Sequence, residues 1–271
     1  MSTNTWYPGH VNKARRKIKD ILKQTNAIIL VLDSRAPYSS MAFDEIKLIE
    51  SRSNVLVLLN KSDIADDKIT EEWRIFFLKK GFKVLPFSIK HPVKRKSIIN
   101  LLKLKDRITK LMIMGIPNVG KSTVLNYLVA RKSTQTANKA GVTRGIQWIR
   151  LDDTTLLLDT PGILYANISN EDLFTKLFFI KAINSDKVDI LDFSCRLIDF
   201  LRDHYPDKLK KILDSDSPSY EYLIELSKKK NFFSKGNLPD VERAAFYLYN
   251  YVTNGKLGRI SYERVSDGYV K

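Results

Sequence analysis

Residues 115–122 read G-I-P-N-V-G-K-S, which has the spacing of a phosphate-binding loop, G-x-x-x-x-G-K-[ST]. Such a loop needs glycine because backbone N–H groups close around phosphate oxygens and a Cβ would obstruct them. Lys121 is expected to reach the β- and γ-phosphates of a nucleotide, and the Ser122 hydroxyl is expected to bind magnesium. The other residues expected at this site are Asn118, Val119, Gly120 and Thr123.

A second polar box, Asn60-Lys61-Ser62-Asp63, follows the apolar run 55–59 and fits N-K-x-D, a guanine-binding box. The Asp63 carboxylate can accept hydrogen bonds from the ring N–H and the exocyclic amine of guanine, whereas adenine offers no such donor pair. Asn60 can bond to the other edge of the base, and the Lys61 stem can lie along the ring. Asn and Asp are common in turns, but the position directly after a buried strand makes this box informative.

Further short motifs would complete a guanine-nucleotide site. Ser88 and Ile89 belong to S-I-K, which fits the S-[AI]-K box whose backbone N–H contacts the guanine oxygen. Residues 159–162 read D-T-P-G and fit D-x-x-G, where Asp159 would hold magnesium through water and the Gly162 N–H would meet the γ-phosphate. Thr143 lies between the phosphate loop and D-x-x-G, as does the switch threonine that closes on magnesium and γ-phosphate. Magnesium is therefore expected at Ser122, Thr143 and Asp159.

These motifs need strands and helices to position them. Apolar runs predict strands, and apolar residues at helical spacing predict helices around them. The expected strands are 27–33, 55–59, 83–87, 111–114, 147–151 and 155–159, and the expected helices are 11–24, 43–50, 71–80, 123–130, 173–183, 188–201, 220–226 and 241–252. Residues 91–110 are rich in Lys and Arg and are interpreted as a basic connector.

The motifs occur in a rotated order. Common small GTPases run phosphate loop, Thr, D-x-x-G, N-K-x-D and S-A-K, whereas here N-K-x-D and S-x-K come first. Each strand still leads into its own motif, so the same sheet can form with rotated connections. The sequence predicts a circularly permuted P-loop GTPase domain of α/β class over 1–170, with a mostly parallel sheet, one antiparallel hairpin and helices on both faces.

Residues 171–271 contain helical spacing and no persuasive strand, so they predict an all-helical second domain. The chain runs from Gly162 directly into this domain. Order and disorder of that one segment could therefore relay the nucleotide state to the helices.

Charge points to a polyanionic partner. The 271 residues include 46 basic and 30 acidic ones, a net charge of +16. Residues 1–170 carry +15 of this excess and residues 171–271 carry +1. Solubility would explain some excess, but a charge of this size more often marks nucleic acid binding, here expected mainly through the first part of the chain.

Other classes of protein are disfavoured by composition. The single cysteine, Cys195, excludes an intramolecular disulfide and a cysteine-rich zinc site. The apolar runs are too short to span a bilayer, and the first ten residues lack a signal peptide pattern. The protein is expected to be cytoplasmic, free of membrane and monomeric when unbound.

The sequence resembles the YlqF/RbgA family, the ribosome biogenesis GTPase A type, in four features. These are the rotated motif order, the opening W-Y-P-G-H-V-N-K-A, the loop G-I-P-N-V-G-K-S and the box D-T-P-G-I. The resemblance is specific over residues 6–165 and continues afterwards in character and length. It implies a GTP- and GDP-binding GTPase that acts in late maturation of the large ribosomal subunit and contacts that subunit and its rRNA. The helical domain 171–271 is expected to contact RNA or the ribosome. Hydrolysis would be slow in the free protein and stimulated by the subunit.

Two residue roles stay open. Common GTPases place a Gln after D-x-x-G to orient water, but Ile163 and Leu164 stand here and cannot bond to water. The family resemblance implies His10 as the catalytic group; the other interpretation is a structural or RNA-facing histidine. Asn118 resembles the Asn that coordinates potassium in GTPases activated by that ion; the other interpretation is a loop Asn bonded to its own backbone.

Two other functions are compatible with part of the sequence. A metabolic P-loop phosphotransferase would need an acceptor pocket and lid arginines and would not need N-K-x-D. An RNA-binding protein with a non-catalytic nucleotide site would not need the intact Lys121, Ser122 and Asp159.

Overall fold

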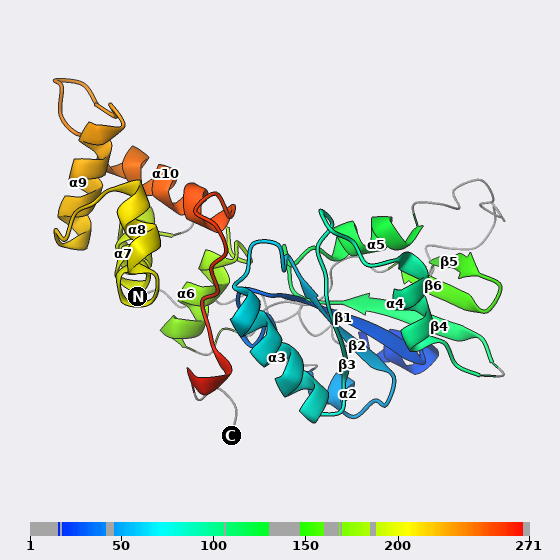
Figure 1. Cartoon of the computed structure of the whole chain (residues 1–271). Helices are drawn as coiled ribbons and strands as arrows, with labels where there is room; N and C mark the ends of the chain where they lie inside the picture. The colour runs from blue at the N-terminus through cyan, green and yellow to red at the C-terminus, as the bar shows by residue number, and fades with distance from the viewer. Residues whose placement is uncertain are drawn as a thin grey trace.

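The computed structural model describes residues 16, 18–41, 46–105, 107–129, 147–159, 168, 170–184 and 188–267. A sheet with its covering helices lies at one end of the molecule, and a cluster of helices lies at the other (Figure 1).

The sheet has six strands in the order β3-β2-β1-β4-β6-β5. All neighbouring strands are parallel except the β5–β6 hairpin at one edge. This confirms the predicted sheet and the rotated connections. The strands are β1 (Ala27–Asp33), β2 (Val55–Asn60), β3 (Lys83–Pro86), β4 (Thr109–Met114), β5 (Gln147–Asp152) and β6 (Thr155–Asp159).

The centre of the sheet is apolar on both faces. Every residue of β1 and β2 is buried, which is why both segments read as continuous apolar runs. β1 pairs with β4, so the first strand of the chain neighbours the strand that leads into the phosphate loop. A helix over residue 16 and residues 18–24 buries Ile18, Ile21 and Leu22 in the same core, as its amphipathic pattern predicts.

Helices cover the sheet above and below in the view of Figure 1. They are α2 (Ile46–Glu50), α3 (Asp67–Lys79), α4 (Arg95–Leu102) and α5 (Lys121–Val129), with a short 3-10 turn η1 (Ser39–Met41). The interpretation of 91–110 as a connector was wrong, because α4 lies inside it. Ile98, Ile99 and Leu102 are buried, but the basic residues between and around them obscured the short apolar stripe.

The described residues after 170 are helical apart from loops, one isolated bridge and the 3-10 turn η3 (Val265–Asp267). The helices are α6 (Glu171–Phe179), α7 (Ile190–His204), α8 (Pro206–Ile212), α9 (Ser219–Lys229) and α10 (Val241–Thr253). α8 was not predicted, because seven residues opened by a proline carry little periodicity. α6 ends before residue 183, since Lys181 adopts a left-handed φ of 63°. Among these described helices, none is long and apolar enough to cross a bilayer.

The chain after α10 returns to the sheet (Figure 1). The Ile260 N–H donates to the Ile64 carbonyl at 3.0 Å, and the Tyr262 N–H donates to the Arg35 carbonyl at 2.7 Å. The buried Glu263 carboxylate accepts from the Ser39 hydroxyl at 2.7 Å. The last described segment therefore fastens the helical part of the chain to the sheet.

Candidate nucleotide-binding site

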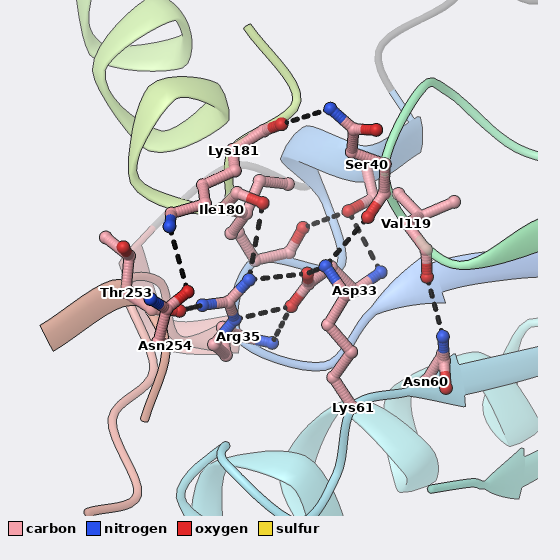
Figure 2. Close-up of polar contacts among 12 residues, drawn as sticks. Asp33, Arg35, Ser40, Asn60, Lys61, Val119, Ile180, Lys181, Thr253 and Asn254 are labelled. Carbon is pink, nitrogen blue, oxygen red and sulfur yellow. Dashed lines mark hydrogen bonds and ion pairs between the residues drawn. The ribbon is translucent and has the colours of Figure 1, made fainter. Parts of the chain in front are cut away.

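Three of the predicted motifs lie at the carboxyl ends of strands, along one edge of the sheet. The phosphate loop follows β4, N-K-x-D follows β2 and S-I-K follows β3, which is the edge where open α/β sheets bind ligands. The Asn60 side-chain amide donates to the Val119 carbonyl at 2.7 Å (Figure 2). The guanine box and the phosphate loop are thus bonded to each other, although 59 positions separate these two residues.

The phosphate loop has the backbone that an anion cradle requires. Gly115 and Gly120 have φ values of 154° and 101°, and a Cβ on Gly120 would overlap the Asn60 amide nitrogen. Lys121 donates to the Ile116 carbonyl at 2.6 Å, which folds its side chain back over the loop. Burial lowers the pKa of Lys121 to about 8. A phosphate would supply the counter-ion that this ammonium group needs, so the residues present fit a nucleotide.

The base box is held in one conformation by its own polar contacts. Lys61 has a left-handed φ of 61°, and its ammonium lies 2.8 Å from both the Asn118 carbonyl and an Asp33 carboxylate oxygen. Asp63 forms an ion pair with Lys90 at 3.0 Å. Burial alone would raise the pKa of Asp63, but the hydrogen bonds from Lys90 and Ser88 outweigh it and lower that pKa. The carboxylate is therefore charged, as guanine recognition requires.

A buried ion cluster beneath the base box was missed in the sequence. Asp33 is 0% exposed, and Arg35 bonds to both of its carboxylate oxygens, at 2.9 and 2.8 Å (Figure 2). Burial would raise the pKa of Asp33, but the neighbouring Arg35 and Lys61 cations prevail and hold it at about 2. The available signal was a charged residue at the end of an otherwise apolar strand, with an arginine two positions later.

The same cluster reaches the helical part of the chain. Arg35 donates to the Thr253 carbonyl at 2.6 Å and to the Ile180 carbonyl at 3.3 Å, at the C-terminal ends of α10 and α6. These carbonyls have no partner within their helices, and a cation there also meets the negative end of the helix dipole. The guanine box is thus linked through Lys61, Asp33 and Arg35 to both helices.

Asn118 provides a second link. Its side-chain amide donates to the Lys181 carbonyl at 2.7 Å, and the Lys181 ammonium donates to Asn250 and Asn254 of the α10 end at 2.8 Å each (Figure 2). Neither interpretation made from the sequence included this partner of Asn118.

Some predicted site residues lie outside the described residues. These are His10, Thr143 and Gly162, together with the side chain of Asp159, whose backbone ends β6. Ser122 and Thr123 lie exposed in the first turn of α5, and Ile89 is exposed beside the base box. Within the described part of the chain, no cluster of three acidic, His or Cys side chains could hold a metal.

Comparisons with known proteins give GTPase relatives. The family model described as RsgA GTPase matches residues 13–169, and that described as 50S ribosome-binding GTPase matches residues 110–232. Ribosome biogenesis GTPase A of Thermotoga maritima is 36% identical over 97% of this chain and 95% of its own length.

Two solved structures are similar to this one. A GDP-bound YlqF structure has a TM-score of 0.73 and 34% identity, covering 93% of this chain and all of that one. A GNP-bound YlqF structure from Thermotoga maritima has a TM-score of 0.70 and 34% identity, covering 93% of this chain and 98% of that one. Sequence, site and fold agree, and the chain belongs to the ribosome biogenesis GTPase A (YlqF/RbgA) family of circularly permuted GTPases.

Proposed function

We propose that this GTPase is an assembly factor for the large ribosomal subunit, acting late in its maturation and switched by GTP hydrolysis. The observation that carries the proposal is the bonding of the guanine box to the phosphate loop, through Asn60 to Val119 and Lys61 to Asn118. A site built in this way suits a guanine nucleotide. The names of the relatives support ribosome biogenesis as the process.

Each motif has a role in this proposal. Asp63 accepts from guanine, and the Ser88-Ile89 backbone meets the guanine oxygen. Lys121 and the Gly162 N–H contact the terminal phosphates. Magnesium is held by Ser122, Thr143 and Asp159, and potassium would bind the Asn118 side-chain oxygen while its nitrogen bonds to Lys181.

Hydrolysis is proposed to be slow in the free protein. Ile163 and Leu164 replace the water-orienting Gln, and His10 is the candidate for that role when the protein is bound to the large subunit. Stimulation by the subunit would couple hydrolysis to release. The nucleotide state would reach the helical part of the chain, proposed to span 171–271, through the segment after Gly162 and through the contacts of Asn118 and Arg35.

The partner is proposed to be the large subunit and its rRNA. The +15 charge of residues 1–170 supports binding to RNA phosphates, which would make the affinity fall with salt as counterions are released. We place the protein in the cytoplasm and expect it to be monomeric when it is not bound to ribosomes.

The test is turnover by the full chain with GTP or ATP, alone, with large subunits and with small subunits. We expect hydrolysis of GTP, stimulation by large subunits, and co-sedimentation with them that is stronger with a non-hydrolysable GTP analogue than with GDP. ATP turnover that requires a small-molecule acceptor would show a phosphotransferase. Subunit binding indifferent to nucleotide, without turnover, would show an RNA-binding protein with a non-catalytic site.

A further inference from the structure

α10 lies in the helical part of the chain (Figure 1), and the side chains on its outer face are unusual for a surface helix. The inner face packs Ala244, Ala245, Leu248, Tyr249 and Val252 into the core. The opposite face would ordinarily carry charged side chains. It carries one acidic side chain, Glu242, in its first turn, and beyond that mainly aromatic and amide side chains with one arginine: Arg243, Phe246, Tyr247, Asn250, Tyr251 and Asn254.

These side chains line a pocket of about 340 Å³ together with Phe232 and Lys256. The volume is at the low end of ligand pockets, which run from about 300 to 1,000 Å³. Phe246 is 40% exposed at its edge. None of the described residues that line the pocket is acidic.

Three of the pocket's aromatic rings pack against one another. Tyr247 and Tyr251 stack with centroids 5.6 Å apart and planes at 23°, and Phe232 meets Tyr247 edge to face at 5.7 Å. Cations lie against the same rings. The Arg243 guanidinium is 4.5 Å from the centre of the Phe232 ring, and the Lys230 ammonium is 4.9 Å from that of Tyr247.

Stacked rings with cations and no carboxylate match one class of ligand. A nucleobase offers a flat π face to aromatic side chains and polar edges to amides, and its phosphates pair with Lys and Arg. In a duplex the base faces are covered by stacking, so only an unpaired nucleotide can enter. A peptide would need no such density of cations around the rings.

We propose that this α10 pocket binds an unpaired nucleotide of an RNA strand by stacking. The inference rests on the proposed function for the source of that RNA, the ribosomal subunit, and assigns a contact to the part of the chain with the smaller charge excess. Two of its residues, Asn250 and Asn254, bond to Lys181, whose carbonyl accepts from Asn118 of the phosphate loop. The pocket is therefore hydrogen-bonded, through Lys181, to the nucleotide site.

The experiment uses the full chain, a fluorescent single-stranded RNA oligonucleotide and a duplex RNA of equal length. Phe246→Ala and Tyr251→Leu should weaken single-strand binding about 5- to 150-fold and duplex binding far less. Tyr220→Ala is the matched control, because Tyr220 is 50% exposed and does not line the pocket. An RNA carrying 4-thiouridine should cross-link to the pocket aromatics. Thermal unfolding and GTP affinity of each variant show that the fold and the nucleotide site are intact.

Unchanged single-strand binding in both folded variants, or equal loss for single strand and duplex, would overturn the inference. So would cross-links that map elsewhere, or a pocket blocked by a purified ribosomal protein rather than by RNA. If subunits stimulate GTP hydrolysis in wild type and variants alike while RNA binding is unaltered, the pocket assignment fails and the proposed function stands. If pocket variants lose RNA but the wild type neither binds large subunits nor responds to them, the proposed function fails instead.

Discussion

The side-chain amide of Asn118 lies 2.7 Å from the backbone carbonyl of Lys181, and it joins the phosphate loop to the end of α6. Lys181 has the left-handed φ that commonly terminates a helix, and its ammonium continues to Asn250 and Asn254. A shift of the phosphate loop on binding phosphate would therefore be transmitted to α6 and α10 through these hydrogen bonds, in addition to any effect along the segment after Gly162.

Asn118→Ala should loosen this connection. Loss of one hydrogen bond is worth about 0.5–1.5 kcal/mol, so amide hydrogen exchange over residues 176–184 should become faster. Its response to GDP against a GTP analogue should also shrink. Lys181→Ala is the comparison variant: it keeps the carbonyl that accepts from Asn118 and removes the ammonium contacts to α10, so it separates the connection to α6 from the connection to α10. Wild-type exchange in Asn118→Ala would show that this contact does not couple the two parts.

Asp63→Asn should weaken GTP binding and shift preference toward xanthosine triphosphate, since an amide cannot accept from both guanine donors. Competition of each nucleotide against a fluorescent guanine analogue measures the shift. Lys90→Ala removes the ion partner of Asp63 and keeps the carboxylate, so guanine selectivity should survive in it. Guanine selectivity that persists in Asp63→Ala would exclude Asp63 from base recognition.

Nucleotide affinity should depend on pH through Lys121. Burial lowers the pKa of Lys121 to about 8 in the free protein, and bound phosphates would raise it. Binding then benefits from the charged group fully below pH 8 and weakens by up to about tenfold per unit above it. Titrations of a fluorescent GDP from pH 6.5 to 9.5 measure this. Lys121→Arg keeps its charge throughout and should flatten the profile; a flat wild-type profile would contradict the assignment.

Stability should fall with pH through Glu263. Burial raises the pKa of Glu263 to about 7, although hydrogen bonds from Ser39 oppose it. The folded pKa exceeds the unfolded one, so the contribution is fully present below pH 4.5 and is lost as pH rises through 7. The loss is at most about 3 kcal/mol. Urea unfolding from pH 5 to 8 should show this fall in the free energy of unfolding in the wild type and in the control Glu242→Gln, whose side chain is exposed. Glu263→Gln should lack it, and an identical slope there would assign the pH dependence to another group.

His10→Ala should bind GTP normally and hydrolyse it slowly on the large subunit. Alignment of water and charge stabilisation supply most of phosphoryl transfer catalysis, and Ile163 cannot align water. Single-turnover hydrolysis with saturating subunits is the measurement, beside the affinities for GTP and for the subunit. Wild-type turnover would leave His10 a structural role, and lost subunit binding would make it an RNA contact.

The sequence by itself determined the fold class and the site motifs. The phosphate loop, the guanine box and D-x-x-G are each a short continuous stretch of sequence. Each follows a strand that can be recognised from its apolar run, so the spacing within each motif is enough to predict what it binds. Even the rotated order could be interpreted, because each motif keeps its own strand.

Only the tertiary structure decided how these parts are joined. The bonds from Arg35 to Thr253, from Asn118 to Lys181 and from Ser39 to Glu263 join residues 218, 63 and 224 positions apart. Partners so distant leave no periodic signal, and a single polar residue in a turn looks the same with or without a partner. Packing of α6 and α10 against the sheet brings these partners together. Leaving a buried polar group without a hydrogen bond costs free energy, so each buried group in these contacts is paired.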